Sequence, residues 1–189
     1  DIPELATTLE QSFPSGNLEF TLFDACMMGT AEVFYELRNA THYCVASVME
    51  TPVAGFPYDR FFINLYDKSI DYAKICSETI QFNKENNWWG TYAAVDCTAM
   101  GEVAQAIQSE LLSHQSELPT LDYTQIQQYG YGQYQYFAFD VVDLISQLNG
   151  GVVPTNVQNS MDKAVIAKDC LDGEEYPLGT LKIAPERFC

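Results

Sequence analysis

A cysteine placed for nucleophilic chemistry lies in the stretch Asp24-Ala-Cys-Met-Met-Gly29, directly after the apolar run 18–23. The run predicts a buried strand, and the residues from Gly29 onward predict a helix. Cys26 therefore lies at the carboxyl end of a strand, where open α/β sheets bind their ligands. The start of a helix also favours the thiolate, which is the reactive form of cysteine. We predict that Cys26 is a nucleophile; the alternative is an inert core residue of an α/β domain.

A thiol nucleophile needs an imidazole as proton acceptor or cationic partner. The sequence has two histidines. His42 is expected at the amino end of the second strand, which places it at the opposite sheet edge, roughly 15 Å from Cys26 for a strand of about five residues. His114 is expected in the last turn of a helix, where a cation suits the helix dipole. We therefore expect the catalytic histidine to come from sequence outside this chain.

The elements that must position these residues alternate between strand and helix patterns. Strands are predicted at 18–23, 43–47, 92–95, 164–167 and 181–183. Helices are predicted at 29–39, 58–84, 99–116, 139–148 and 156–163. Residues 3–16 are expected to form an irregular lead and residues 122–136 a surface loop. This alternation predicts an α/β fold with a mostly parallel sheet and helices on both faces.

Charge and composition limit the partners of the chain. Its 189 residues carry a formal net charge of -17, and the pI is about 4.1. Nucleic acids and anionic membranes are polyanions, so this charge disfavours both as partners, whereas it attracts a cationic substrate. No stretch approaches the ~20 apolar residues that a membrane span requires.

The remaining cysteines do not indicate a metal site or a disulfide framework. The six cysteines form no CxxC pair, and the two histidines stand too far apart for a zinc pattern. Cys44, Cys76 and Cys97 lie in apolar segments and are predicted to be buried small hydrophobic residues. The sequence leaves open whether Cys170 and Cys189 form a disulfide.

Several motifs together resemble the clostripain family of cysteine peptidases. They are Phe23-Asp-Ala-Cys-Met-Met-Gly29, Glu32-Val33, Tyr35-Glu-Leu-Arg38, the strand end Val45-Ala-Ser47 and the turn Gly55-Phe-Pro-Tyr58. The resemblance continues more loosely through Phe139 to Leu144 and Met161 to Ile166.

The resemblance implies a caspase-like three-layer sandwich, of which this chain supplies only part of the sheet. Residues 1–189 are then the cysteine-bearing portion of one peptidase domain. Family members use a Cys-His dyad and cleave after arginine or lysine, and their histidine lies on an upstream strand. Many are secreted bacterial proteins that cut themselves into two associated chains. We therefore expect the catalytic histidine on an N-terminal companion chain, and we expect Asp1 to be a terminus created by processing.

The resemblance also implies which residues bind substrate. Asp24 would help form the pocket for a basic side chain, and period-two alternation places Asp24 and Cys26 on the same side of the strand tip. The alternative is that Asp24 caps the following helix. The loop after the second strand should form the wall of the pocket with Ser47, Glu50, Thr51, Pro52, Val53 and Ala54.

That loop departs from the family pattern. Members often carry a second acidic residue just before the glycine of the turn, where this chain has Val53-Ala54-Gly55. Glu50 or Asp59 could substitute for it. A lone acid still favours basic side chains, but it discriminates less strongly against neutral ones.

No cofactor is expected for the chemistry. Clostripain itself depends on calcium, so Asp140 and Asp143 are candidate calcium ligands, although such residues more often cap the helix that they precede. The alternative function is a non-catalytic secreted binding or scaffold protein that kept the fold and lost the dyad.

Overall fold

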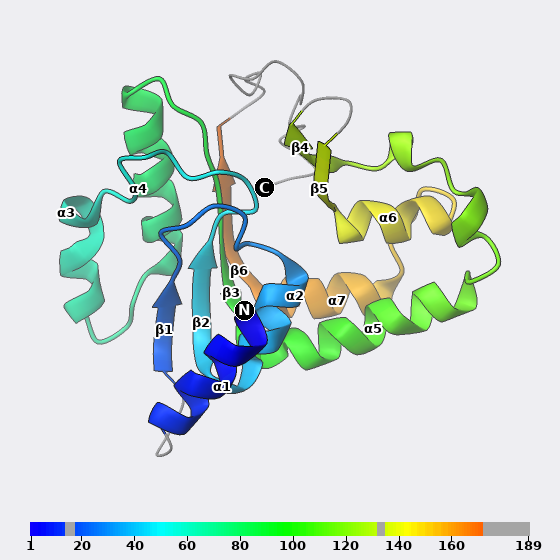
Figure 1. The fold of residues 1–189 in the computed structure, drawn as a ribbon, viewed down its shortest axis with the longest axis horizontal. Coiled ribbons are helices and arrows are strands. Elements are labelled where there is room, and N and C mark those ends of the chain that lie inside the picture. Colours follow the sequence, from blue (N-terminus) through cyan, green and yellow to red (C-terminus); the bar gives the residue numbers. More distant parts are fainter. Residues whose placement is uncertain (14–17, 132–134, 172–189) are drawn as a thin grey trace.

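A four-stranded mixed sheet lies between two layers of helices (Figure 1). The computed structural model of the protein describes residues 1–13, 18–131 and 135–171. The sheet strands are β1 (Leu18–Leu22), β2 (Thr41–Ala46), β3 (Thr91–Asp96) and β6 (Val165–Cys170), in the spatial order β1-β2-β3-β6. The predicted α/β class with helices on both faces is confirmed.

The directions of the strands differ from the expected mostly parallel sheet. β1 and β2 pair in parallel, with Leu18 opposite Thr41 and Leu22 opposite Val45. β3 runs antiparallel to β2, and β6 runs antiparallel to β3. Among the described pairs of this sheet, only the first is therefore parallel. The sequence did not reveal this because a strand buried on both faces is apolar throughout, whatever its direction.

Helices of unequal length cover the two faces of the sheet. One face packs against α1 (Ile2–Ser12), α2 (Ala31–Glu36), α5 (Met100–Ser113) and α7 (Thr155–Ala164), and the other against α3 (Tyr58–Phe61) and α4 (Tyr72–Glu85). Short 3-10 helices lie at Leu37–Asn39, Phe62–Tyr66, Cys97–Ala99, Leu118–Thr120 and Tyr123–Gln125. α6 (Val141–Leu148) packs on α5 and α7 beyond the end of the sheet.

Successive residues of the central strands feed two separate cores. On β2, Cys44 and Ala46 belong to the core under α1, α2, α5 and α7, while Val45 belongs to the core under α3 and α4. The prediction that Cys44, Cys76 and Cys97 are buried is confirmed. Burial raises the pKa of the Cys76 thiol to about 12, so it stays protonated and inert near neutral pH.

Two helical segments differ from the sequence prediction. The expected irregular lead forms α1, which begins with the Asp1 side chain accepting a hydrogen bond from Glu4 N at 2.9 Å. The single helix expected at 58–84 is interrupted between residues 66 and 72. There Asn64 exchanges hydrogen bonds of 2.8 and 3.1 Å with the backbone of Asp71, whose own side chain caps α4. Apolar residues recur at helical spacing on both sides of this polar interruption, so the sequence pattern predicted one continuous helix.

The region expected to be a surface loop at 122–136 contains a β-hairpin instead. Its strands are β4 (Gln128–Tyr131) and β5 (Gln135–Phe139), which pair antiparallel. The Tyr129 hydroxyl donates to Asp140 Oδ2 at 3.0 Å and so ties the hairpin to the start of α6. Because this bond forms only once the chain has folded, the apolar spacing of the sequence did not indicate the hairpin. Phe139 accordingly belongs to β5 and not to the helix that was expected to start there.

Two predictions lie outside the described residues, namely the strand at 181–183 and the partner role of Cys189. None of the helices in the described part of the chain has the length and apolar character that a membrane crossing needs.

Candidate functional site

The segment that carries Cys26 is hydrogen-bonded along its length to the neighbouring strand and loop. Phe23 N donates to Val45 O at 2.9 Å and Met27 N donates to Met49 O at 3.0 Å. Gly29 N then donates to Ser47 O at 2.8 Å. These bonds continue the β1–β2 pairing past the end of β1 and hold the thiol at the carboxyl edge of the sheet. The sequence predicted this placement of Cys26.

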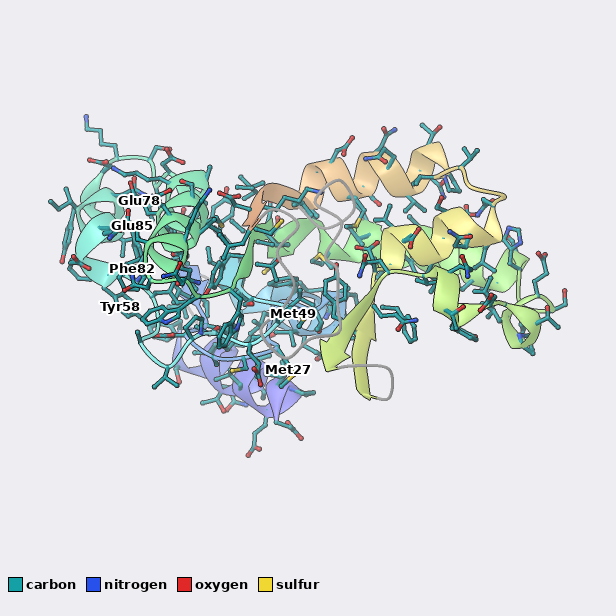
Figure 2. All side chains as sticks on the ribbon, turned by 90° about the horizontal axis from the view of Figure 1, so that it is seen from above. Met27, Met49, Tyr58, Glu78, Phe82 and Glu85 are labelled. Carbon is teal, nitrogen blue, oxygen red and sulfur yellow. The ribbon has the colours of Figure 1, made fainter. Side chains whose placement is uncertain are left out.

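Two backbone features allow the sharp turn after the thiol. Met27 has φ of 58°, a left-handed conformation that is uncommon for a residue with a side chain. Gly29 approaches the backbone just after β2 so closely that a Cβ atom there would lie 2.6 Å from Val48 N. Uncommon backbone conformations collect at functional sites, where the surrounding structure holds them in place. Figure 2 views the molecule from above, and it shows Met27 and Met49 near each other in the central part of the view.

The Cys26 side chain is half-buried under the loop that follows β2. Its Sγ lies 3.9 Å from Thr51 O, and the Thr51 hydroxyl donates to Ala25 O at 3.3 Å. The loop therefore contacts both the thiol and the backbone beside it. Unlike the fully buried Cys44 and Cys97, Cys26 keeps access to solvent, which argues against an inert core residue.

Asp24 lies exposed beside the turn at residues 55–58. Its Oδ2 accepts hydrogen bonds from the Tyr58 hydroxyl at 3.0 Å and from Phe56 N at 3.5 Å. Gly55, with φ of 70°, leaves the space for the carboxylate, because a Cβ atom there would lie 2.4 Å from Oδ2. The alternative role of Asp24 as a helix cap is not observed, since Thr30 caps α2 through its hydroxyl.

Asp24 and Cys26 lie within electrostatic reach of the same buried tyrosine. Burial raises the pKa of Tyr92 to about 12, and the nearby charges of Asp24 and Cys26 act in the same direction. Burial likewise raises the pKa of Tyr58 to about 12, with the Asp24 carboxylate as the second cause. Both phenols therefore remain protonated near neutral pH, so the Tyr58 hydroxyl can donate to Asp24.

The predicted wall residues occupy different positions in the loop. Ser47 is fully buried, and its hydroxyl accepts from Met49 N at 3.1 Å. The carbonyl oxygen of Glu50 accepts from the Trp89 indole at 3.2 Å. Pro52 is buried, and its carbonyl oxygen accepts from Gly55 N at 2.8 Å. That these residues contact substrate stays a prediction.

Two wall residues and Asp59, one of the two possible substitute acids, are exposed. Val53 and Ala54 are exposed, with no acidic group at either position. Asp59 is exposed in α3, one residue after the tyrosine that binds Asp24. The loop tip at Val53 and Ala54 thus carries no acid, and the Asp24 carboxylate beside the following turn is hydrogen-bonded in place.

Neither histidine of the chain lies near the thiol. His42 is at the amino end of β2, where its Nδ1 lies 3.3 Å from Glu19 Oε2. His114 follows α5, and its Nδ1 lies 2.9 Å from Glu117 Oε1. Because β1 and β2 are parallel, His42 and Cys26 lie at opposite edges of the sheet, as the sequence predicted.

The candidate calcium ligands bind protein groups. Asp140 Oδ1 accepts from Asp143 N at 2.7 Å as the cap of α6, and Asp143 Oδ2 accepts from Gln127 N at 2.7 Å. Burial raises the pKa of Asp140 above its usual range. Within residues 1–13, 18–131 and 135–171, no three histidine, cysteine or acidic side chains gather as a metal site would require.

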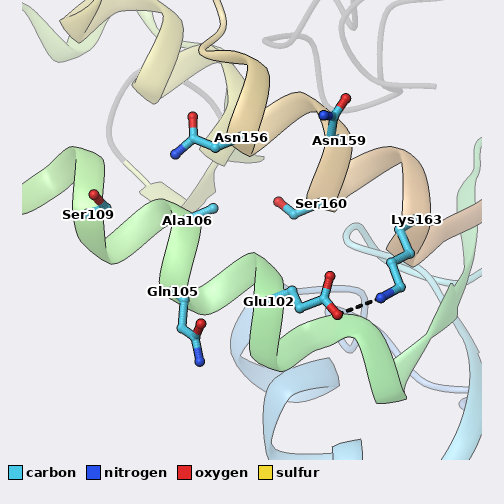
Figure 3. A pocket seen from close by; sticks show the side chains of 8 residues that line it. All are labelled: Glu102, Gln105, Ala106, Ser109, Asn156, Asn159, Ser160 and Lys163. Carbon is cyan, nitrogen blue, oxygen red and sulfur yellow. Dashed lines mark hydrogen bonds and ion pairs between the residues drawn. The ribbon is translucent and has the colours of Figure 1, made fainter.

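A polar depression lies between α5 and α7, away from the thiol (Figure 3). Glu102 and Lys163 form an ion pair across it, and amide and hydroxyl side chains line the rest. It contains neither of the residues that the sequence assigned to chemistry. The site with chemical potential is therefore the edge at Cys26.

The sequence did not identify Phe56 and Tyr58 as hydrogen-bond partners of Asp24. These residues stood in a motif, but nothing in the sequence showed that the turn folds back onto Asp24, more than 30 residues earlier. A glycine and a proline flanking aromatic residues were the only local signal of a fixed turn.

Comparison with known proteins gives one family. The family model described as the clostripain family matches residues 1–173. No curated protein sequence matches the chain.

Three similar solved structures carry the same kind of description. A clostripain from Bacteroides thetaiotaomicron, in complex with the peptide inhibitor BTN-VLTK-AOMK, is 25% identical with a TM-score of 0.78, over 97% of this chain and 81% of that chain. An inactive zymogen of a C11 protease from Parabacteroides distasonis is 25% identical with a TM-score of 0.77, over 97% and 53% of the two chains. A secreted C11 cysteine protease from Bacteroides thetaiotaomicron is 25% identical with a TM-score of 0.77, over 97% and 51%.

Proposed function

The chain belongs to the clostripain family of cysteine proteases, and from this membership we propose that it is the cysteine-bearing part of an endopeptidase that cleaves after basic residues. The observation that carries the proposal is the geometry of the sheet edge. There the half-buried thiol of Cys26 and the exposed carboxylate of Asp24 lie on one short segment, under one loop. A nucleophile and a binding site for a cation are thereby held together.

The proposed chemistry is acyl transfer to the thiol. The Cys26 thiolate attacks the carbonyl carbon of the scissile peptide, and the S–C bond forms as the carbonyl π electrons move to oxygen. Backbone N–H groups near the thiol stabilise that oxyanion. Collapse of the tetrahedral intermediate breaks the C–N bond, and an imidazolium protonates the leaving amine. Water, deprotonated by the same imidazole, then attacks the thioester and releases the acid and the thiolate.

We infer that the imidazole comes from a companion segment that precedes this chain in the precursor. Both histidines of the chain lie away from the thiol. β1, whose end leads to Cys26, is an end strand of the sheet that the described residues form. A preceding strand that pairs with β1 in parallel would bring its carboxyl end, and a histidine there, to the edge where Cys26 lies. Self-cleavage of the precursor into two associated chains is part of this proposal.

The proposed substrate is a peptide with arginine or lysine before the scissile bond. A carboxylate that is exposed and held by two hydrogen bonds is ready to bind a cationic side chain without reorganising. The strongly acidic chain attracts such substrates. The similar clostripain binds an inhibitor whose name contains VLTK, which ends in lysine in one-letter code. Since one similar structure is of a secreted protease, we propose secretion or a cell-surface or periplasmic location in a bacterium for this protein.

The test uses the assembled protease with all its chains and a fluorogenic peptide that carries lysine before the reporter group. We expect Cys26→Ala to lower kcat by at least about a thousandfold, because the nucleophile is removed. We expect Asp24→Asn to raise KM for basic peptides. Asp67→Asn, which makes the same change of charge at an exposed acid outside the candidate site, should leave KM nearly unchanged. Hydrolysis that survives alkylation of Cys26 would contradict the proposal.

The rival function is that of a non-catalytic secreted binding or scaffold relative. It is favoured by the distance of both histidines from the thiol. The discriminating observation is the precursor sequence, in which the proposed peptidase requires an upstream strand ending in His-Gly. A precursor without such a histidine would favour the scaffold function.

A further inference from the structure

The two oxygens of the Asp24 carboxylate differ in their hydrogen bonding. Oδ2 accepts from the Tyr58 hydroxyl at 3.0 Å and from Phe56 N at 3.5 Å. A carboxylate oxygen has about two lone-pair sites, so both sites of Oδ2 are used. In the described part of the chain, no donor is bound to Oδ1. The carboxylate therefore offers one oxygen to a ligand.

The Tyr58 hydroxyl is held in place by the packing of α3 against its neighbours. The Tyr58 ring packs against the rings of Phe61 and Phe56, with centroid distances of 5.7 and 6.4 Å. Two residues later, Arg60 forms an ion pair with Glu85 of α4 and lies 5.0 Å above the ring of Phe82. Figure 2 shows Tyr58 on the same side of the molecule as Phe82 and Glu85. The bond to Asp24 thus comes from a turn that is anchored to the second helix layer.

Lysine and arginine make different demands on a carboxylate. The guanidinium group of arginine is planar and binds best with two parallel N–H donors, one to each oxygen. The ammonium group of lysine is a compact charge that needs only one oxygen. A carboxylate with one oxygen already saturated cannot accept the arginine fork without losing a bond to the protein. The exposed loop tip at Val53 and Ala54 offers no second acid for the remaining arginine donors.

We propose that Tyr58 is a specificity-determining residue that occupies Asp24 Oδ2 and so makes the protease prefer lysine over arginine before the scissile bond. The inference rests on the proposed endopeptidase function and deepens it. Tyr58 acts as a positioning residue, because it touches Asp24 and not the reacting atoms.

The experiment compares two peptide substrates that differ only in lysine or arginine before an aminomethylcoumarin group, cleaved by the assembled protease. We expect kcat/KM to be about three to ten times higher for the lysine substrate, the range that one hydrogen bond supplies. Tyr58→Phe keeps the ring packing and removes one donor, which frees one lone-pair site of Oδ2. In this variant we expect the arginine-to-lysine ratio of kcat/KM to rise by a similar factor.

Tyr66→Phe is the matched control. Tyr66 lies in the neighbouring 3-10 helix, is 77% exposed and packs on Phe62, so the same chemical change is made on the same segment away from Asp24. We expect the ratio in this variant to equal that of the native protein. A purely structural role of Tyr58 would lower kcat/KM for both substrates without moving their ratio.

A binding measurement separates this inference from the proposed function. The Cys26→Ala protein is titrated calorimetrically with the same two peptides, so no hydrolysis is needed. Tighter binding of the lysine peptide, with the difference lost in Cys26→Ala/Tyr58→Phe, supports the inference even if the native protein proves inactive. Equal binding of both peptides, a preference for arginine, or a lysine preference that Tyr58→Phe leaves unchanged overturns it.

Discussion

At the scale of single residues, the edge that carries Cys26 depends on backbones that approach one another closely. Gly29 donates its N–H to Ser47 O while its Cα faces the backbone of the same strand end. A side chain there would have to push two hydrogen-bonded segments apart, and neither neighbour is a flexible side chain that could give way. The position therefore demands glycine for space and not for its backbone conformation.

Gly29→Ala should destabilise the protein and weaken catalysis together. The added Cβ would lie 2.6 Å from Val48 N and 2.7 Å from the Ser47 carbonyl carbon, so we expect a loss of about 2 kcal/mol in the free energy of unfolding. We also expect kcat to fall, because the segment that carries Cys26 must shift. Denaturant unfolding and steady-state kinetics measure the two effects.

Gly101→Ala is the control, because a Cβ at Gly101, inside α5, would meet no atom within 4 Å. This change should stabilise the protein by about 0.5–1 kcal/mol through helix propensity. A Gly29→Ala protein as stable as the native one would show that the segment is free to move.

The residues of the site were predictable to different degrees. Cys26 and Asp24 could be found because a strand followed by a helix start is a local pattern. Tyr58 could not be found, because its hydrogen bond with Asp24 joins residues 34 positions apart through a turn whose direction no pattern encodes. Side-chain contacts between distant segments are set by the packing of whole elements.

At the scale of elements, the end of α5 carries a pair whose charge depends on pH. His114 follows the last helical residue and is hydrogen-bonded to Glu117. This bond is the main cause of a raised pKa of His114. The pair stabilises the fold fully below the unfolded pKa of about 6.5, and the contribution is lost as the pH rises through the folded pKa.

We expect Glu117→Gln to lower the pKa of His114, since the carboxylate that favours the imidazolium is removed. An NMR titration of the imidazole C–H signals measures the change in both proteins. Glu10→Gln, which makes the same change at an exposed acid of α1, serves as the control and should leave the midpoint of His114 unchanged. An unaltered midpoint for His114 would refute the pairing.

The elements themselves were predictable where one period dominates. The strands at 18–22 and 91–96 and the helix at 100–113 follow the apolar spacing of the sequence. The break between α3 and α4 and the hairpin β4–β5 were not predicted, because polar side chains define both through contacts with distant backbone. The directions of the strands were not predicted for a similar reason, since direction depends on how the connections cross the sheet.

At the scale of the whole molecule, we predict that the proposed hydrolysis needs no metal ion. In the described residues, Asp140 and Asp143 hold the start of α6 and the hairpin, with oxygens bound to backbone N–H groups. We expect that EDTA leaves kcat of the assembled protease unchanged. Thermal unfolding with and without calcium measures any effect on Tm. A loss of kcat that calcium restores would contradict this prediction.

The family, and with it the α/β class, was predictable from motifs concentrated in residues 18–59. The sequence could not show which of those motif residues touch one another. Nor could it show that β4 and β5 pair and pack through Tyr129 and Ala138 against Met49, two residues before Thr51. Such a contact joins the far part of the chain to the loop above the thiol.

The hydrogen bond from the Trp89 indole to Glu50 O makes the fluorescence of Trp89 a reporter of the loop after β2. The bond links the indole to the residue before Thr51, so a peptide that displaces the loop must change the surroundings of this fluorophore. Trp88, the other tryptophan of the chain, packs edge-on against Phe82 of α4 at 5.6 Å and supplies a steady background. Within this chain, Trp88→Phe would leave Trp89 as the one indole, and a shift of its emission maximum on adding peptide would report that the loop has moved.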